Sequence, residues 1–264
     1  MASEVRGLVT QDGTPPAEMR RVAQDQLSAY DSFQLRDEVR VEAIQSRERR
    51  FVVDAGEHSV AVRRVLLAVG IVDQLPDLPG LRDLWGVSVF QCPYCHGWEL
   101  RDRTFGYLAP DDHCADWSLI LRAWTKDLVV FTDQRFEVAP ELRAELEQAS
   151  IRIEEQKVVG LRADRDRRLA AVQLADGSEV AREVMFARPA QAQTPLVKQL
   201  GLALAERDLV RVDECHQTSI AGIYAAGDLV CHEHGALTAA ASGASAAHAL
   251  AEDLTRELLA EGVI

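Results

Sequence analysis

Several features are missing from this 264-residue sequence, and each absence narrows the kinds of protein it can be. Basic residues are outnumbered by acidic ones: 29 Lys and Arg against 42 Asp and Glu give a formal net charge of -13. This charge disfavours a nucleic acid or an anionic membrane as partner, because both attract basic surfaces. No apolar run reaches the length of a bilayer span, and Met1–Arg6 has no apolar core of signal-peptide length. We therefore expect a cytoplasmic protein that acts on a small molecule or a protein.

The sequence has five cysteines but only one Cys-x-x-Cys pair, Cys92 and Cys95, within Cys92-Pro93-Tyr94-Cys95-His96-Gly97-Trp98-Glu99. In a reducing compartment cysteines are catalytic, metal-binding or inert more often than they form a structural disulfide framework. Two thiols at this spacing can close and reopen a small ring, which is typical of a redox switch. His96 and Glu99 are the titrating side chains close enough in sequence to adjust thiolate formation.

Three other interpretations of the Cys92/Cys95 pair stay open at this point, because the pair alone is a weak signal. The cysteines could be reduced and buried, packing as small hydrophobic side chains. They could bind zinc if other ligands came from the scattered pairs His113-Cys114, Cys215-His216 or Cys231-His232. Cys-x-x-Cys-His also fits covalent haem attachment, but that chemistry normally follows export.

The pattern along the chain indicates an α/β protein. A helix is expected after Thr14, followed by strands near residues 39–41, 51–53 and 65–69. Strands near 87–90, 104–108 and 128–131 then alternate with helical stretches, which predicts a parallel sheet. The tail contains a strand at 220–226 and a helix at 235–259. Small residues in this last helix would let it approach another backbone or a flat ligand closely: Gly235, Ala236, Ala239, Ala240, Gly243 and Ala244.

Four motifs, taken together and in this order, give the chain a family resemblance. They are Val65-Leu66-Leu67-Ala68-Val69-Gly70, Leu75-Pro76-Asp77-Leu78-Pro79-Gly80, Cys92-Pro93-Tyr94-Cys95-His96-Gly97 and Gly222-Ile223-Tyr224-Ala225-Ala226-Gly227-Asp228. The chain resembles thioredoxin-reductase-like, FAD-dependent pyridine nucleotide-disulfide oxidoreductases over nearly its whole length. Its branch has Cys-Pro-Tyr-Cys-His-Gly and includes the dithiol oxidases of natural-product pathways.

The resemblance implies two Rossmann-like, three-layer domains. A discontinuous and N-terminally truncated FAD domain would span residues 1–87 and 210–264. A second nucleotide-binding-like domain, 88–209, would be inserted into it and would carry the cysteine pair. A homodimer is expected by the same analogy.

The resemblance also implies roles for individual residues. Cys92 and Cys95 would be the exchanging dithiol that faces the flavin, and His96 would be the base that deprotonates a thiol or, equally, a residue that caps the local turn. The cofactor-binding residues would be Gly70, Gly227, Asp228, His234, Gly235 and Ala236. Asp228 would bond the ribityl hydroxyls of FAD, and the helix start at 235–236 would face the polar edge of the flavin ring. No metal is expected.

Two departures from the family pattern affect the expected cofactors. No Gly-x-Gly-x-x-Gly follows a strand near residue 1, so the unit that holds the ADP half of FAD is absent from the pattern, and weakened flavin affinity is expected. The segment Tyr107–Ala115 also has no glycine-rich loop. There Pro110 lacks an N–H, and Asp111 and Asp112 would repel a pyrophosphate. NADPH binding is therefore expected to be weak or absent.

The sequence thus favours a flavin-linked thiol–disulfide oxidoreductase that works in the direction of dithiol oxidation. Its partner would be a small-molecule dithiol or disulfide, or a thioredoxin-like protein. One alternative is an NADPH-dependent thioredoxin reductase homologue. Another is a cofactor-deficient remnant that acts as a binding or oligomerisation protein.

Overall fold

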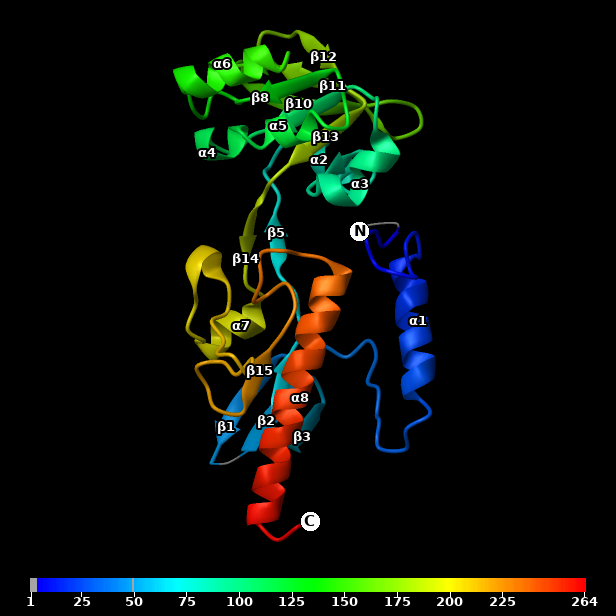
Figure 1. Ribbon diagram of the computed structural model, residues 1–264, viewed down its shortest axis with the longest axis vertical. Helices are drawn as coiled ribbons and strands as arrows, with labels where there is room; N and C mark the ends of the chain where they lie inside the picture. Colours follow the sequence, from blue (N-terminus) through cyan, green and yellow to red (C-terminus); the bar gives the residue numbers. More distant parts are fainter. Residues whose placement is uncertain (1–3, 49) are drawn as a thin grey trace. The chain divides into compact units, whose positions relative to one another are not determined.

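A computed structural model describes residues 4–48 and 50–264 of the chain. The structure contains two compact units (Figure 1). Unit 1 takes the described part of Met1–Arg6, with Asp12–Pro16 and Gln74–Ala190, and unit 2 takes Gly7–Gln11, Ala17–Asp73 and Gln191–Ile264. The domain limits expected after residues 87 and 209 stay a prediction, because a compact unit need not be a domain that folds alone.

Unit 1 is built on a parallel sheet of five strands in the order β6-β13-β7-β8-β9. These strands are β6 (Val89–Phe90), β7 (Phe105–Leu108), β8 (Leu128–Phe131), β9 (Arg152–Glu154) and β13 (Val184–Ala187). An antiparallel sheet is formed by β10 (Val158–Ala163), β11 (Leu169–Leu174) and β12 (Glu179–Ala181). The helices are α2 (Leu81–Leu84), α3 (Pro93–Leu100), α4 (Asp112–Ala115), α5 (Ser118–Leu121) and α6 (Pro140–Gln148).

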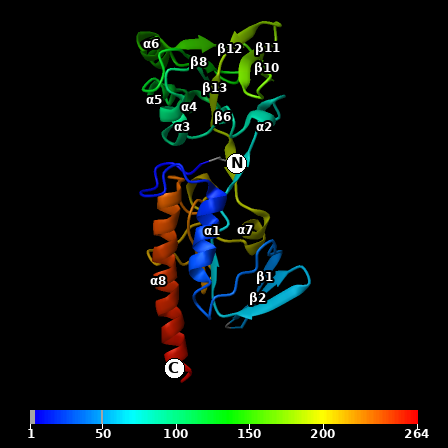
Figure 2. The same cartoon turned by 90° about the vertical axis from the view of Figure 1, so that its right-hand side faces the viewer.

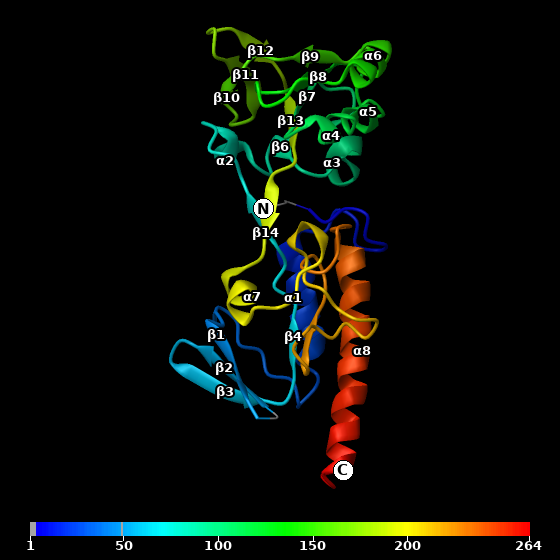
Figure 3. The same cartoon turned by 90° about the vertical axis from the view of Figure 1, so that its left-hand side faces the viewer.

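Alternate residues of the parallel strands enter two different cores, which gives unit 1 three layers. Phe105, Tyr107 and Phe186 face one core together with Leu121 and Leu146 from the helices. The next residues along the same strands face a second core, shared with α2 and the antiparallel sheet; its members include Leu108, Met185, Leu81, Leu161 and Val172. Figure 3 shows α4, α5 and α6 on one side of the parallel sheet and β10–β12 on the other. The α/β class is confirmed.

Unit 2 combines an antiparallel meander with a short parallel pair. The meander is β1 (Ala43–Arg47), β2 (Arg50–Ala55) and β3 (His58–Val62), and the parallel pair is β4 (Val65–Leu67) and β15 (Ile223–Ala225). Its helices are α1 (Pro16–Leu27), α7 (Pro195–Leu200) and α8 (Ala236–Ala260), with a 3₁₀ turn at Glu206–Asp208. The core of unit 2 contains Phe51, Leu67, Val197, Ile223 and Leu229. In Figures 2 and 3 the meander and α8 lie on opposite sides of this unit.

After residue 17 the chain crosses between the units twice, and the two crossing strands, β5 (Val72–Gln74) and β14 (Ala190–Ala192), form a two-stranded sheet. The strand expected at 39–41 is not formed; the polar segment Ala43–Arg47 is the strand instead, because it pairs with β2. The helix expected after Thr14 is present as α1, but none of its residues is buried. Among the described residues, no helix has the length and apolarity needed to span a bilayer.

Candidate functional site

A disulfide joins Cys92 and Cys95 at the start of α3, with 5.3 Å between their Cα atoms. Cys92 is the N-cap of α3 and Pro93 is the first helical residue, where the missing N–H of proline costs nothing. The N-cap has no side-chain hydrogen bond to the first turn. On reduction, a thiolate at Cys92 would therefore face free backbone N–H groups, which favour the charged form.

Helix α3 is fixed by one buried face, on which lie Pro93, Gly97 and Leu100. Gly97 packs against the indole of Trp124 so closely that an added Cβ would lie 2.7 Å from Trp124 Cδ2. Cys92, Cys95 and His96 are only partly buried. The buried face therefore anchors the helix while its redox pair stays within reach of a reactant.

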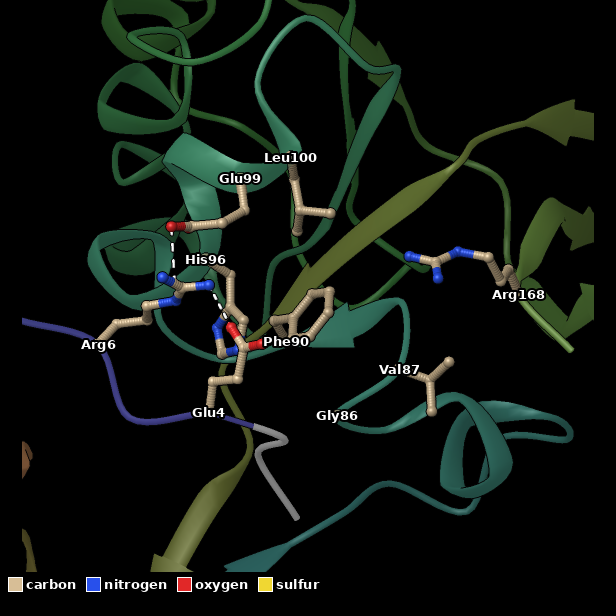
Figure 4. A pocket seen from close by; sticks show the side chains of 9 residues that line it. All are labelled: Glu4, Arg6, Gly86, Val87, Phe90, His96, Glu99, Leu100 and Arg168. Atoms are coloured by element: carbon tan, nitrogen blue, oxygen red, sulfur yellow. Dashed lines mark hydrogen bonds and ion pairs between the residues drawn. The ribbon is translucent and has the colours of Figure 1, made fainter. Parts of the chain in front are cut away.

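His96 lies directly after the disulfide and lines a cavity of about 330 Å³ in unit 1 (Figure 4). Its ring stacks on Phe90, with 4.2 Å between the ring centroids and 25° between the planes. Burial lowers the pKa of His96 from its ordinary value of 6.5, while a hydrogen bond with the Cys92 backbone acts in the opposite direction. Its Nδ1 is buried without a hydrogen-bond partner. A neutral imidazole with a vacant ring nitrogen can accept a proton at neutral pH.

Beside His96, the wall of this cavity holds a group of charged side chains that no local sequence pattern connects with His96. Arg6 forms ion pairs with Glu4, with Asp12 at 3.3 Å and with Glu99 of α3 at 3.5 Å. Figure 4 shows Arg6 between Glu4 and Glu99, beside His96. No local pattern in the sequence indicates this contact, because Arg6 and Glu99 lie 93 positions apart in the chain.

Three of the expected cofactor residues come together in unit 2. Gly70, Gly227 and Asp228 line one cavity of about 200 Å³, together with Ala239 and Gly243 of α8. Both glycines have a positive φ, 65° and 83°, so they form turns that other residues adopt at a cost. The N–H of Gly227 donates to Ser242 Oγ at 3.1 Å, which holds this turn against α8.

The other three expected cofactor residues, His234, Gly235 and Ala236, form the N-terminal end of α8 and do not line this cavity. Gly235 is the N-cap and provides no side-chain hydrogen bond, so the first N–H groups of a 25-residue helix have no cap. His234 Nε2 is buried without a partner. A glycine-lined cavity, an acidic side chain and an uncapped helix start fit the polar groups of a flavin. Gly70, Gly227 and Asp228 would hold it from the sheet side, and residues 234–236 from the helix side.

In unit 1, acidic side chains occupy the edge of the parallel sheet where a dinucleotide would bind in an open α/β fold. Asp111, after β7, caps α4 by accepting the N–H of Cys114 at 2.8 Å. Asp112 accepts the N–H of Ala139 at 3.2 Å. Asp133, after β8, accepts the N–H of Val158 at 2.8 Å and pairs with Arg135. The backbone N–H of Cys114, which a phosphate could use, is already bonded within the chain.

The remaining cysteines, Cys114, Cys215 and Cys231, are free thiols. Burial raises the pKa values of Cys114 and Cys231, so both are less reactive than an ordinary thiol. Within residues 4–48 and 50–264, no three His, Cys, Asp or Glu side chains are grouped so that they could hold a metal ion. The two sulfurs that the zinc interpretation needs as ligands are joined in the Cys92–Cys95 disulfide.

Comparisons with known proteins agree with the fold of the chain. The sequence pattern of the family described as "Pyridine nucleotide-disulphide oxidoreductase" matches residues 125–250. A protein of Arthroderma benhamiae named "Probable thioredoxin reductase" is 28% identical over 257 residues, which cover 85% of this chain and 63% of that protein. "Thioredoxin reductase tcpT" of Claviceps purpurea is 29% identical and is covered over 71% of its length.

The crystal structure of HlmI has the same fold, with a TM-score of 0.89 and 30% identity, and the match covers 99% of this chain and 83% of HlmI. The chain spans slightly less than two thirds of the Arthroderma relative, at 63% of its length. The family pattern, the named relatives and the fold of HlmI all indicate the same family. The chain belongs to the thioredoxin-reductase-like pyridine nucleotide-disulfide oxidoreductase family.

Proposed function

We propose that this protein is a flavin-linked thiol–disulfide oxidoreductase that oxidises a dithiol through the Cys92–Cys95 pair. The observation that carries the proposal is the disulfide at the start of α3, with the vacant nitrogen of His96 one residue further along. The substrate would be a small dithiol or a thioredoxin-like protein. Relatives named thioredoxin reductases support the same class of chemistry.

Oxidation of a dithiol by this disulfide takes two thiol–disulfide exchange steps. A thiolate of the substrate attacks one sulfur of the Cys92–Cys95 disulfide, so a mixed disulfide forms and the other cysteine leaves as a thiolate. The second substrate thiol gives its proton to His96 and attacks the mixed disulfide, which releases the oxidised substrate and both reduced cysteines. The substrate loses two electrons and two protons, and the cysteine pair gains the electrons.

FAD, when bound, supplies a two-electron acceptor that can reoxidise the cysteine pair and pass the electrons to molecular oxygen. The cavity around Gly70, Gly227 and Asp228 supports this cofactor. The edge that carries Asp111, Asp112 and Asp133 disfavours NADPH as the electron donor, because these carboxylates would repel a pyrophosphate and the N–H of Cys114 is already bonded to Asp111. This supports the oxidation direction over reduction of a disulfide.

The test is turnover of a dithiol by the FAD-loaded chain, measured as oxygen consumption, in Cys92→Ser and Cys95→Ser variants. Both variants should lose turnover, because each lacks one member of the exchanging pair. Cys215→Ser changes an exposed thiol elsewhere and should keep it. Retained turnover in both pair variants would refute the proposal.

A second experiment separates the proposal from an NADPH-dependent reductase. NADPH is mixed anaerobically with the FAD-loaded chain in a stopped-flow instrument. We expect no rapid loss of flavin absorbance. Rapid bleaching would show that NADPH delivers electrons despite the acidic edge, and the function would then be disulfide reduction.

A further inference from the structure

A second cavity in unit 1, of about 260 Å³, opens beside α3 and is lined by three cationic side chains. Arg101 and Arg122 come from the ends of α3 and α5, and Lys126 precedes β8. Asp102 is the one acidic side chain in the lining, so positive charge is in excess. In a protein with a formal net charge of -13, such a local excess is unusual.

The two guanidinium groups are held in place without an acidic partner. Arg122 donates to the carbonyls of Ala149 and Thr125, at 2.8 and 2.5 Å. Arg101 donates to the carbonyl of Trp98 at 2.8 Å. In the part of the chain that the structure describes, neither arginine nor Lys126 forms an ion pair with a carboxylate. A guanidinium has five N–H donors, so each arginine keeps donors for an anion.

Aromatic side chains form the rest of the cavity wall. Trp98 is 66% exposed. The Arg101 guanidinium lies over its ring at 4.2 Å from the centroid, which fixes both groups. Trp124 also lines the cavity and is held by contact with Gly97. A wall of indole rings beside fixed cations suits a molecule with an apolar chain and one negative charge.

The position of this cavity relates it to the redox pair. Trp98 follows Cys95 by three residues on α3, and residues with this spacing are neighbours on a helix surface, with Cβ atoms about 5–6 Å apart. A ligand held against Trp98 therefore lies on the face of α3 that also carries Cys95. The cavity is smaller than the roughly 300–1,000 Å³ of pockets that enclose a whole drug-sized ligand, so it suits one end of a substrate.

We infer that the cavity formed by Trp98, Arg101, Arg122, Trp124 and Lys126 binds the carboxylate end of a small dithiol or disulfide substrate. This inference rests on the proposed function for the identity of the ligand, and it adds the substrate class: an acidic small molecule with an apolar stem. The anion contributes to binding and leaves the exchange step at Cys92 and Cys95 unchanged.

The test compares two dithiols that differ in one group. Dihydrolipoate carries a carboxylate, and dihydrolipoamide has a neutral amide in its place. With the FAD-loaded full chain, we expect kcat/KM to be about tenfold higher for dihydrolipoate than for dihydrolipoamide, since one charge-assisted contact is worth about this factor. The difference should arise from a lower KM for dihydrolipoate. In the double variant Arg101→Gln/Lys126→Gln the preference should be lost, because KM for dihydrolipoate should rise to the value for dihydrolipoamide. Lys157→Gln removes one exposed positive charge elsewhere in unit 1 and should keep the preference.

Binding is measured independently of turnover, through quenching of the fluorescence of the four tryptophans by lipoate and lipoamide. Lipoate should bind more tightly in the unmodified chain, with an affinity that falls as salt is added, and the double variant should lose this difference. Inorganic phosphate should compete only weakly; strong competition would reassign the cavity to phosphate ligands. Equal affinity for lipoate and lipoamide would overturn the inference even if turnover is seen. Tight lipoate binding without turnover would keep the inference for the cavity and reject the proposed oxidase.

Discussion

His96 combines a lowered pKa with a buried Nδ1 that has no hydrogen-bond partner. Burial lowers its pKa below 6.5, so the imidazole is neutral at pH 7 and can accept a thiol proton. In the FAD-loaded protein, the acid limb of kcat/KM for dithiol oxidation should lie below pH 6.5. In His96→Gln this pH dependence should disappear and kcat/KM should fall about 100-fold, the lower end of what a general base contributes. An unchanged pH profile in His96→Gln would leave His96 with a structural role only.

The same pKa shift predicts how stability depends on pH. In the unfolded chain His96 binds a proton as the pH falls through 6.5, whereas in the folded protein it does so only at a lower pH. The unfolded state therefore gains protons first, and the free energy of unfolding should fall as pH drops below 6.5. Urea unfolding at pH 7.5 and 5.5 measures this loss. The loss should be smaller in His96→Gln, and an equal loss in both proteins would contradict the prediction.

Gly97 is a residue for which the structure leaves no room for a side chain. A methyl group there would lie 2.7 Å from Trp124 Cδ2, in a helix whose glycine conformation is otherwise ordinary. Gly97→Ala should therefore lower the free energy of unfolding by about 1–3 kcal/mol, as overpacking does. An added Cβ at Gly243 in α8 would have no atom within 4 Å, so Gly243→Ala should instead raise the free energy of unfolding by about 0.5–1 kcal/mol. Denaturant unfolding of both variants provides the comparison.

At the residue scale, sequence predicted local features and missed long-range contacts. The spacing of Cys92 and Cys95 allowed the two cysteines to close a small ring, and the structure contains this disulfide; the redox role of the pair stays a prediction. The stacking of Phe90 on His96 and the ion pair between Arg6 and Glu99 depend on how distant segments fold together. Side chains such as these carry no periodic or local signal, so a single sequence cannot indicate them.

Helix α8 is attached to the sheet of unit 2 by an ion-pair network. Arg64 pairs with Asp253 at 2.6 Å and with Glu257 at 2.5 Å, and Asp253 also accepts the hydroxyl of Tyr224. Hydrogen bonds from Arg64 lower the pKa values of Asp253 and Glu257. Because the folded pKa values lie below the unfolded ones, this stabilisation is complete above about pH 4.5 and is lost as the pH falls through the folded values.

Arg64→Met keeps the apolar stem and removes the charge, so it tests this network directly. We expect the free energy of unfolding at pH 7 to fall by about 1 kcal/mol, a modest value because part of the network is open to solvent. Arg256→Met removes an exposed ion pair, Arg256–Glu252 at 3.8 Å, and should change the free energy of unfolding by less than about 0.5 kcal/mol. If the two variants unfold at the same urea concentration, the network does not hold α8.

Elements with a strong apolar pattern were predictable, and those held by pairing alone were not. The parallel strands β7 and β8 are continuous buried runs, and α8 has a long helical pattern, so the sequence indicated all three. The polar strand β1 forms because β2 pairs with its backbone, while its side chains remain mostly exposed. The strand expected at 65–69 is shorter in the structure: β4 ends at Leu67, before the chain turns at Gly70, which has a positive φ.

For the whole molecule, the central question is whether unit 2 binds FAD with the residues described. A ligand that binds only the folded state stabilises it by about 2.7 kcal/mol at 100 times its Kd. FAD should therefore raise the unfolding midpoint of the chain. The rise should be smaller in Asp228→Asn, because Asp228 lines the glycine-bearing cavity. Glu214→Gln makes a similar change at an exposed position and should leave the rise intact.

The outcome of this titration decides between an enzyme and a remnant, because the redox pair in unit 1 needs an electron acceptor to turn over. A rise that depends on Asp228 would place the cofactor at the cavity of Gly70 and Gly227, and the dithiol experiments would then measure a complete electron path. No rise at any FAD concentration would leave the Cys92–Cys95 disulfide as a single-use oxidant. In that case the chain would oxidise one equivalent of dithiol and stop, which a stoichiometric thiol titration would detect.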